Sequence, residues 1–310
     1  MGTGHIERIP IIKPARLSPG DQIGIIAPAG PVNESDLQPS LKILECSGFR
    51  VRLAPNVYNR QGYLAGEDEA RLEDLHVMFQ DQEIRAIFCA RGGYGSLRLL
   101  DKIRYDLIKG NPKIFVGYSD MTALLMAIYR KTGLVTFHGP MVRELASGDQ
   151  GNRENLLWII SSTRPIKLSL TEGGTSLIPG RATGPLIGGN LSLICHLLGT
   201  PFLPSLYGCI LFIEERGEPL YRVDRMLTHL ALSDQLKGIS GMIVGNFEGC
   251  GPMSVINGLL VDMLLGLDVP LATGLPVGHG AKNLALPLGV MAELDTDLMT
   301  LSISEACVRG

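Results

Sequence analysis

The chain has 310 residues, 45% of them hydrophobic, and a formal net charge of −3. This length is enough for two domains with ordinary hydrophobic cores, and the near-neutral charge argues against a nucleic-acid or anionic-membrane partner. The six cysteines are scattered without a C-x-x-C pair, which indicates reduced thiols in a cytoplasmic protein.

Neither a targeting segment nor a metal site is expected. Residues 1–17 contain no long apolar core and no small-residue cleavage site, so a signal peptide is not predicted. The most apolar late stretch, residues 258–275, is interrupted by Asp262, Asp268 and Pro270 and is unsuited to span a membrane. No set of His, Cys, Asp and Glu has zinc-like spacing, and we expect neither a metal nor a cofactor.

The first half of the chain alternates strand and helix signals. Strands are predicted over residues 21–30, 49–55, 83–90 and 113–119, and helices over residues 34–48 and 68–81. This alternation predicts parallel βαβ units, which bind ligands outside the carboxyl ends of their strands. Two loops are expected at such ends, ARGGYGS (Ala90–Ser96) and GYSD (Gly117–Asp120).

A change in composition divides the chain. Residues 161–183 are rich in Ser, Thr, Gly and Pro, which is typical of a linker. We therefore expect an N-terminal α/β domain over residues 1–160 and a second domain over residues 184–310, where helix and strand signals are mixed with many glycines.

Ser119 stands at a corner of the predicted structure. Residues 114–125, IFVGYSDMTALL, run from an apolar strand through Gly-Tyr-Ser-Asp directly into a helix-like pattern. A sharp strand-to-helix turn exposes the corner side chain and aims the next N–H groups at a ligand. Ser119 is therefore either a helix N-cap or a nucleophile. The surrounding sequence is not G-x-S-x-G, because Met121 stands two residues after the serine.

A serine nucleophile needs a base, and two histidines in loops beside glycine are candidates. They are His138 in TFHGPM and His279 in PVGHGAKN. Glycines on both sides of His279 leave the backbone free to place an imidazole in a tight site, so we favour His279. The other histidines lie in the N-terminal tail or in helix patterns (His5; His76, His196, His229).

Two carboxylates and a glycine-rich loop complete the candidate set. Glu214 and Glu215 end an apolar strand, and because successive strand residues face opposite sides, only one of them can point into a shared site. The alternative interpretation is a surface glutamate at a strand end. The loop ARGGYGS could present backbone N–H groups to a phosphate or an oxyanion, but it is neither a Walker loop nor G-x-G-x-x-G.

Together these stretches resemble the LD-carboxypeptidase family of serine peptidases. The matching motifs are APAGP, ARGGYGSLRLLD, VGYSDMTAL, FHGPM, GGNLSLICHLLGTP, ILFIEERGEPLYRVDRML and PVGHGAKNLALPLG. They follow the order of the family and extend over almost the whole chain. The resemblance implies an N-terminal parallel-sheet α/β domain with a nucleophile elbow and a smaller C-terminal α/β domain that supplies the acid and base.

The resemblance also implies a role for individual residues. Ser119 would be the nucleophile, His279 the base and Glu214 the orienting acid of a Ser-Glu-His triad. The N–H groups of Asp120 and Gly93 would form the oxyanion hole. Arg91 is a candidate for holding a terminal carboxylate, because a guanidinium binds carboxylates in a bidentate manner. Arg225 is a weaker candidate, since its helical setting favours a structural ion pair.

The implied reaction is removal of the terminal D-Ala from murein tetrapeptides, at the bond to meso-diaminopimelate, during cytosolic peptidoglycan recycling by a homodimer. A related branch resembles microcin C self-immunity hydrolases, which cut aminoacyl-nucleotide amides and carry an aromatic residue in a longer interdomain loop. Here the only tryptophan, Trp158, lies in an apolar helix-like run, which favours the murein peptide. A two-lobed binding protein without catalysis is the third alternative.

Overall fold

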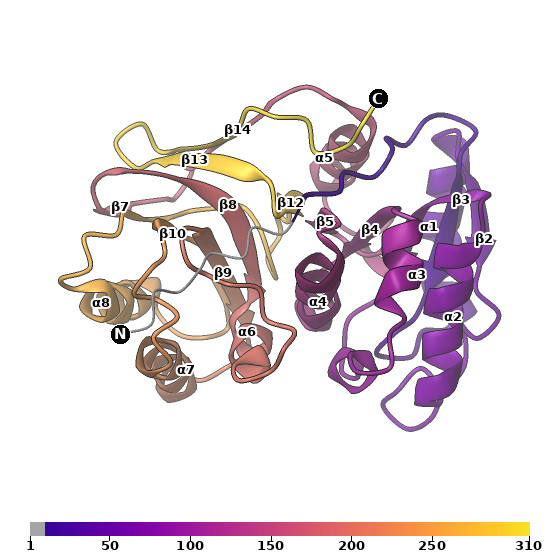
Figure 1. The fold of residues 1–310 in the computed structure, drawn as a ribbon, viewed down its shortest axis with the longest axis horizontal. Coiled ribbons are helices and arrows are strands. Elements are labelled where there is room, and N and C mark those ends of the chain that lie inside the picture. The colour runs from indigo at the N-terminus through magenta and orange to yellow at the C-terminus, as the bar shows by residue number, and fades with distance from the viewer. Residues whose placement is uncertain (1–9) are drawn as a thin grey trace.

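A computed structural model describes residues 10–310. Residues 1–9 lie outside the described residues, and with them His5 and part of the segment in which no signal peptide was expected. Within the described part, the chain forms two sheets with helices packed against them (Figure 1). No helix in residues 10–310 is long and apolar enough to cross a membrane.

The first sheet contains six strands from the described residues, in the order β12-β5-β4-β3-β1-β2. The bounds are β1 (Gln22–Ile26), β2 (Arg50–Leu53), β3 (Ile84–Cys89), β4 (Ile114–Gly117), β5 (Thr136–His138) and β12 (Leu286–Leu288). β1 to β5 pair in parallel, and β12 pairs with β5 in the antiparallel direction. The predicted parallel βαβ arrangement is confirmed.

Two of the helices of the first half, α1 (Glu34–Cys46) and α2 (Asp68–Gln80), lie at the predicted positions. They are followed by α3 (Tyr105–Gly110), α4 (Thr122–Thr132) and α5 (Gln150–Ser161). α1 begins after Asn33, which forms a capping box with Asp36, and α2 carries acids in its first turn, where they complement the helix dipole. α4 is buried from Thr122 to Tyr129, because it lies between the two sheets (Figure 1).

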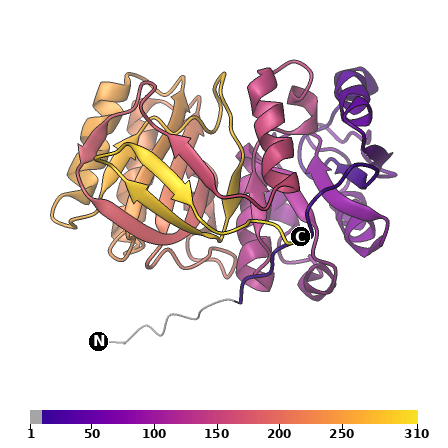
Figure 2. The ribbon, with the colours of Figure 1, turned by 90° about the horizontal axis from the view of Figure 1, so that it is seen from above.

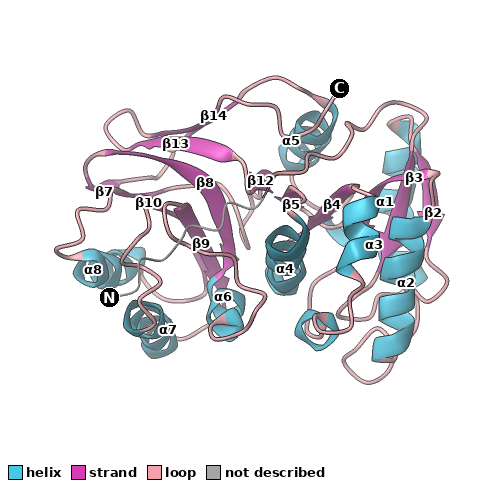
Figure 3. Ribbon diagram, in the orientation of Figure 1, coloured by secondary structure: helices cyan, strands magenta, loops and turns pink. Residues whose placement is uncertain are grey.

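The second sheet contains eight strands from the described residues, in the order β6-β14-β13-β8-β9-β10-β11-β7. The bounds are β6 (Ile166–Ser169), β7 (Ser176–Ile178), β8 (Arg181–Asn190), β9 (Ile210–Arg216), β10 (Gly241–Glu248), β11 (Leu271–Thr273), β13 (Met291–Asp295) and β14 (Thr300–Ile303). Its centre, β8 to β11, is parallel, and the outer strands are antiparallel. Figure 3 shows α6 (Leu191–Leu197), α7 (Leu220–Leu232) and α8 (Met253–Leu264) grouped beside these parallel strands.

The segment expected as a linker, residues 161–183, contains β6, β7 and the start of β8. In β6 buried and exposed residues alternate, as in a strand with one covered face. Ser, Thr, Gly and Pro dominate the turns between these strands, and the short strands themselves lie at or near the sheet edges. The composition therefore marks where the chain passes from the first sheet to the second. The segment is not an irregular linker, because it contains two short strands and the start of a third.

The C-terminal part of the chain returns to the first half of the molecule twice. β12 extends the first sheet next to β5, and Ala15 pairs with Arg309 close to the C-terminus. Figure 2 shows the C-terminus lying against the N-terminal half of the molecule. These returns fix the loop that precedes β12 against the carboxyl end of β4, which is where the candidate site lies.

Candidate functional site

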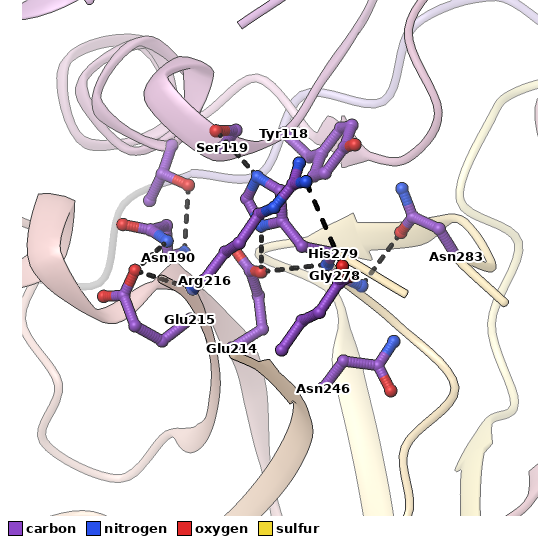
Figure 4. Close-up of polar contacts among 12 residues, drawn as sticks. Tyr118, Ser119, Asn190, Glu214, Glu215, Arg216, Asn246, Gly278, His279 and Asn283 are labelled. Atoms are coloured by element: carbon purple, nitrogen blue, oxygen red, sulfur yellow. Dashed lines mark hydrogen bonds and ion pairs between the residues drawn. The ribbon is translucent and has the colours of Figure 1, made fainter. Parts of the chain in front are cut away.

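Ser119 occupies a strained backbone position at the end of β4. Its φ is +62°, a conformation that residues with a Cβ rarely adopt. The N-cap of the short 3₁₀ turn Ser119–Met121 is Tyr118, and no side-chain capping bond is present there. The helix-cap interpretation of Ser119 is therefore wrong, because its hydroxyl points away from the helix and toward His279 (Figure 4).

Three side chains from separate parts of the chain form one hydrogen-bonded chain. His279 Nε2 lies 3.0 Å from Ser119 Oγ, and His279 Nδ1 lies 2.7 Å from Glu214 Oε2 (Figure 4). The backbone N–H of His279 also donates to Glu214 Oε2, at 3.2 Å. Ser119 comes from the first sheet, Glu214 from β9 of the second sheet and His279 from the loop before β12. Such a chain can pass the serine proton to the imidazole while the carboxylate orients the ring.

Glu214 tunes the basicity of His279. Burial alone would lower the pKa of His279, but the hydrogen bond and the negative charge of Glu214 outweigh it, and the pKa is raised above its ordinary value. Arg216 acts against this shift through its positive charge. The imidazole is therefore a stronger base than a free histidine.

Glu214 and Glu215 have different partners, as their alternation along β9 predicts. Glu214 is fully buried and faces His279. Glu215 is also buried, and its oxygens accept hydrogen bonds from Asn190 Nδ2 at 2.9 Å and from the N–H and hydroxyl of Ser192 at 2.8 and 2.7 Å. Neither is a surface residue. Glu215 anchors the start of α6, and only Glu214 reaches the base.

The backbone of the His279 loop is fixed by two asparagines that the sequence analysis did not select. Gly278 has φ +100°, and a Cβ added there would lie 2.6 Å from Glu214 Oε2, so only glycine fits. Its N–H donates to Asn283 Oδ1 at 3.0 Å, and the N–H of Asn283 donates to Asn152 Oδ1 at 2.9 Å. Asn152 Nδ2 donates in turn to Ala281 O at 2.9 Å. Thus α5, of the first half, holds the loop that carries the base.

The glycine-rich loop packs directly on the nucleophile. A Cβ added to Gly92 would lie 3.1 Å from Ser119 Cβ and 3.2 Å from its Oγ, so a side chain would crowd the hydroxyl. The N–H of Ser96 donates to Asp120 Oδ2 at 2.9 Å, and the Ser96 hydroxyl donates to Asp120 O at 2.6 Å. The loop and the elbow are therefore tied together.

Two N–H groups near this contact have no hydrogen-bond acceptor among the described residues. Within residues 10–310 the Gly93 N–H donates to no backbone or side-chain atom. Asp120 lies in the first turn after the elbow, where N–H groups have no partner inside the helix. These are the two groups that the family resemblance assigns to an oxyanion hole.

His138, the alternative base, lies in the interior beside the site. It is fully buried, and its ring contacts the rings of Phe212 and Tyr118 at centroid distances of 5.2 and 5.6 Å. Neither ring nitrogen has a hydrogen-bond partner among the described residues, and burial lowers its pKa to about 4. No hydrogen bond joins His138 to Ser119 among the described residues, and its lowered pKa makes it a weak base, so it is unsuited to take the serine proton.

A cavity of about 400 Å³ adjoins the base. Its lining includes His279, Tyr118, Glu144, Asn283, Arg153 and Arg216. Tyr118 donates its hydroxyl proton to Glu144 Oε1 at 2.6 Å, and burial raises the pKa of Glu144. A larger hollow of about 850 Å³ continues past His279 along β10 and the loop after β11. The site thus combines a hydroxyl that is hydrogen-bonded to an imidazole with room for a substrate of peptide size.

The two arginine candidates lie apart from this cavity. Arg91 Nη1 donates to Pro31 O at 3.3 Å, and its guanidinium lies against Gly30 on the nucleophile side of the site. Arg225 stacks over the ring of Tyr221 on α7. Among the described residues there is no group of three His, Cys, Asp or Glu side chains placed to hold a metal ion.

Comparisons with known proteins agree with this geometry. Residues 23–139 match the LD-carboxypeptidase N-terminal domain, and residues 183–294 match the LD-carboxypeptidase C-terminal domain. A probable murein peptide carboxypeptidase of Bacillus subtilis is 40% identical, over 96% of this chain and 96% of the relative.

Two solved structures resemble the whole chain. A muramoyltetrapeptide carboxypeptidase from Oxalobacter formigenes has a TM-score of 0.82 and 31% identity, covering 92% of this chain and 99% of its own. A structure of MccF in complex with glutamyl sulfamoyl guanosine has a TM-score of 0.90 and 26% identity, covering 96% and 99%. The similar proteins therefore include both a murein peptide carboxypeptidase and a microcin self-immunity protein, the two branches named from the motifs.

Proposed function

The chain belongs to the LD-carboxypeptidase family, and from this premise we propose that it is a serine carboxypeptidase that removes the terminal D-Ala of murein tetrapeptides. The bond cut would be the L,D bond between meso-diaminopimelate and D-Ala. The observation that carries the proposal is the continuous hydrogen-bonded chain from Ser119 through His279 to Glu214, with distances of 3.0 and 2.7 Å. The named relatives support the class of substrate.

Acylation begins when Ser119 Oγ attacks the carbonyl carbon of the diaminopimelate residue. His279 Nε2 takes the hydroxyl proton as the new O–C bond forms. The N–H groups of Asp120 and Gly93 then stabilise the negative oxygen, a contribution commonly worth about 3 kcal/mol per donor. When the C–N bond breaks, His279 gives its proton to the amine of the leaving D-Ala.

Deacylation repeats these transfers with water. His279 removes a proton from a water molecule, which attacks the ester carbon, and the proton returns to Ser119 Oγ as the ester bond breaks. Glu214 keeps His279 in the same tautomer, with the proton on Nδ1, during both acylation and deacylation, because its Oε2 accepts from Nδ1 and from the backbone N–H of His279. Its charge also stabilises the imidazolium that forms at each step.

The setting of the reaction belongs to the same proposal. We place the enzyme in the cytoplasm, as a homodimer acting on murein peptides during peptidoglycan recycling. Arg91, beside the glycine-rich loop, is proposed to contact the substrate. The absence of a C-x-x-C pair and the predominantly buried free cysteines support a reducing compartment.

A second candidate is hydrolysis of aminoacyl-nucleotide amides, which the TM-score of 0.90 with MccF favours. The segment between the sheets argues for the murein peptide, because residues 161–183 contain no aromatic residue. Trp158 is on α5 and 40% exposed, more than its apolar run predicts, yet it does not line either hollow. Trp158 is therefore not placed to stack on a nucleotide base bound at the site.

The test is incubation of the purified protein with L-Ala-γ-D-Glu-meso-diaminopimelate-D-Ala, with a Ser119→Ala variant in parallel. Mass spectrometry should detect the loss of one alanine with the wild type only. Equal release by both proteins would exclude Ser119 as nucleophile. If neither protein releases alanine, the same pair should be tested on an aminoacyl-sulfamoyl nucleoside, and cleavage there would favour the second candidate.

A further inference from the structure

The mechanism fixes where the terminal carboxylate of the substrate must lie. His279 Nε2 donates a proton to the leaving amine, and that amine is two bonds from the carboxylate carbon of the same D-alanine. The carboxylate is therefore within a few ångströms of the imidazole, on the side of the base. A group that binds it must stand beside His279 rather than behind the glycine-rich loop.

Arg216 is a cation in this position. It follows Glu214 by two residues on β9, so both side chains leave the same face of the strand. Figure 4 shows its guanidinium next to the ring of His279. Its charge also opposes the rise in the pKa of His279 and the rise that burial causes in the pKa of Tyr118, as expected of a cation close to both rings.

The donors of Arg216 are available to a ligand. Among the described residues its guanidinium has one charged neighbour, Glu248 Oε1 at 4.0 Å, and its side chain is 61% exposed. Arg153, which lines the same cavity, already donates to Leu145 O at 2.7 Å. Arg91 does not line the cavity and is bonded to Pro31 O.

A second unused donor belongs to Asn283, a residue that lines the same cavity. Asn283 is 4% exposed, and its Nδ2 has no partner among the described residues, although its Oδ1 accepts from Gly278. In Figure 4 Nδ2 lies on the side away from Gly278. A buried amide nitrogen without an acceptor costs free energy, and a bound carboxylate or carbonyl oxygen would remove that cost.

We propose that Arg216 binds the terminal carboxylate of the leaving D-amino acid, with Asn283 Nδ2 as a second donor, and thereby restricts the enzyme to the last residue of a peptide. The inference rests on the proposed function and specifies its leaving-group side. Arg216 is a specificity residue, because a guanidinium pairs with a carboxylate through two charge-assisted hydrogen bonds and offers much less to a neutral amide. Peptides extended beyond D-Ala would place a neutral peptide group at this position.

The test compares two tetrapeptides that differ only at the C-terminus, the free acid and its primary amide, with the wild type and Arg216→Met. For the wild type, kcat/KM should favour the acid by about 100-fold, the scale of two charge-assisted hydrogen bonds. Arg216→Met should lose about that factor on the acid and stay within about 3-fold on the amide. Arg225→Met, on α7, is the matched control and should keep the preference.

Each other outcome has a distinct meaning. If Arg216→Met loses activity equally on both peptides, Arg216 does not read the C-terminus and the inference fails while the proposed function stands. If Arg216→Met keeps the acid preference and Arg91→Met loses it, the carboxylate lies at Arg91. If the wild type cleaves neither peptide, the proposed function fails and the inference fails with it.

Discussion

The two halves of the molecule supply different parts of the site and hold them by different means. In the first half, Ser119 itself takes a strained conformation, with φ +62°, at the end of β4. In the second half, Glu214 and His279 are not among the residues with positive φ, and the glycine before the base, Gly278, takes φ +100° instead. The nucleophile is therefore placed by its own backbone, whereas the base is placed by neighbouring groups that hold its loop.

Among substitutions in the second half, Glu214→Gln should cause the largest loss of activity. The amide keeps the size of the side chain but removes the charge and favours the wrong imidazole tautomer, so we expect kcat to fall by about 10⁴-fold, the loss known for the equivalent change in a serine protease triad. Steady-state release of alanine measures it. A loss of less than about 10-fold would show that Glu214 does not orient the base.

Glu215→Gln is the matched control on the same strand. All described partners of Glu215 donate to it, so an amide NH₂ there would face other donors. We expect the free energy of unfolding to fall by about 1–3 kcal/mol, with kcat of the folded protein almost unchanged. If kcat of Glu215→Gln were as low as that of Glu214→Gln, the claim that only Glu214 acts on His279 would be contradicted.

Gly278→Ala disturbs the second half without removing a catalytic group. The added Cβ would lie 2.6 Å from Glu214 Oε2, and alanine is strained at φ +100°. The loop must shift, and a displacement of about 1 Å typically costs about 100-fold in rate. Because the shift would also weaken the hydrogen bond to Glu214 that helps to raise the pKa of His279, we expect kcat to fall and the pH of half-maximal activity to move down, and a pH profile of the variant checks both. Wild-type kcat would mean that the loop tolerates the shift.

The raised pKa of His279 predicts the pH dependence. A general base must be neutral, so kcat/KM should fall tenfold per pH unit below the pKa of His279. Since the Glu214 hydrogen bond and charge raise that pKa, the half-maximal point should lie above the ordinary value for histidine, which is about 6.5. His138, with a pKa of about 4, should add no step near neutrality. A half-maximal point below pH 6 would contradict the pairing of His279 with Glu214.

The smallest expected effect tests the strain in the first half. Ser119→Ala and Ser119→Gly should both be inactive, but glycine adopts φ +62° without the Cβ penalty. Ser119→Gly should therefore be more stable than Ser119→Ala by about 1 kcal/mol, measured by urea unfolding. Equal stability would indicate that the elbow is not strained.

The fold of the first half was predictable because its local signals agree with one another. Apolar runs of strand length alternate with helical patterns that have acids in their first turns, and the four strands and two helices predicted there form at those positions. The second half was less predictable. β12 pairs with β5 from the other end of the chain, and such nonlocal pairing leaves no local signal. Residues 161–183 have a loop-like composition, yet tertiary pairing makes them strands.

The candidate site divides in the same way. Ser119 and His279 are recognisable from the sequence around them. Ser119 follows an apolar strand at a sharp turn, and His279 has a glycine on each side. Glu214 is distinguished from Glu215 only by which face of β9 meets the base, and this depends on how the two sheets are packed. Asn152 and Asn283 hold the His279 loop across the two halves, and nothing in their own neighbourhoods in the sequence indicates it.

The central claim is that Ser119 of the first half is activated by His279 of the second half. The most direct measurement is labelling with a fluorophosphonate, followed by mass spectrometry of the intact protein and of its peptides, for the wild type and His279→Ala. We expect one adduct on Ser119 in the wild type and labelling at least about 100-fold slower in the variant. A wild type that is not labelled at Ser119, as expected of a binding protein without catalysis, or equal labelling of both proteins, would contradict it.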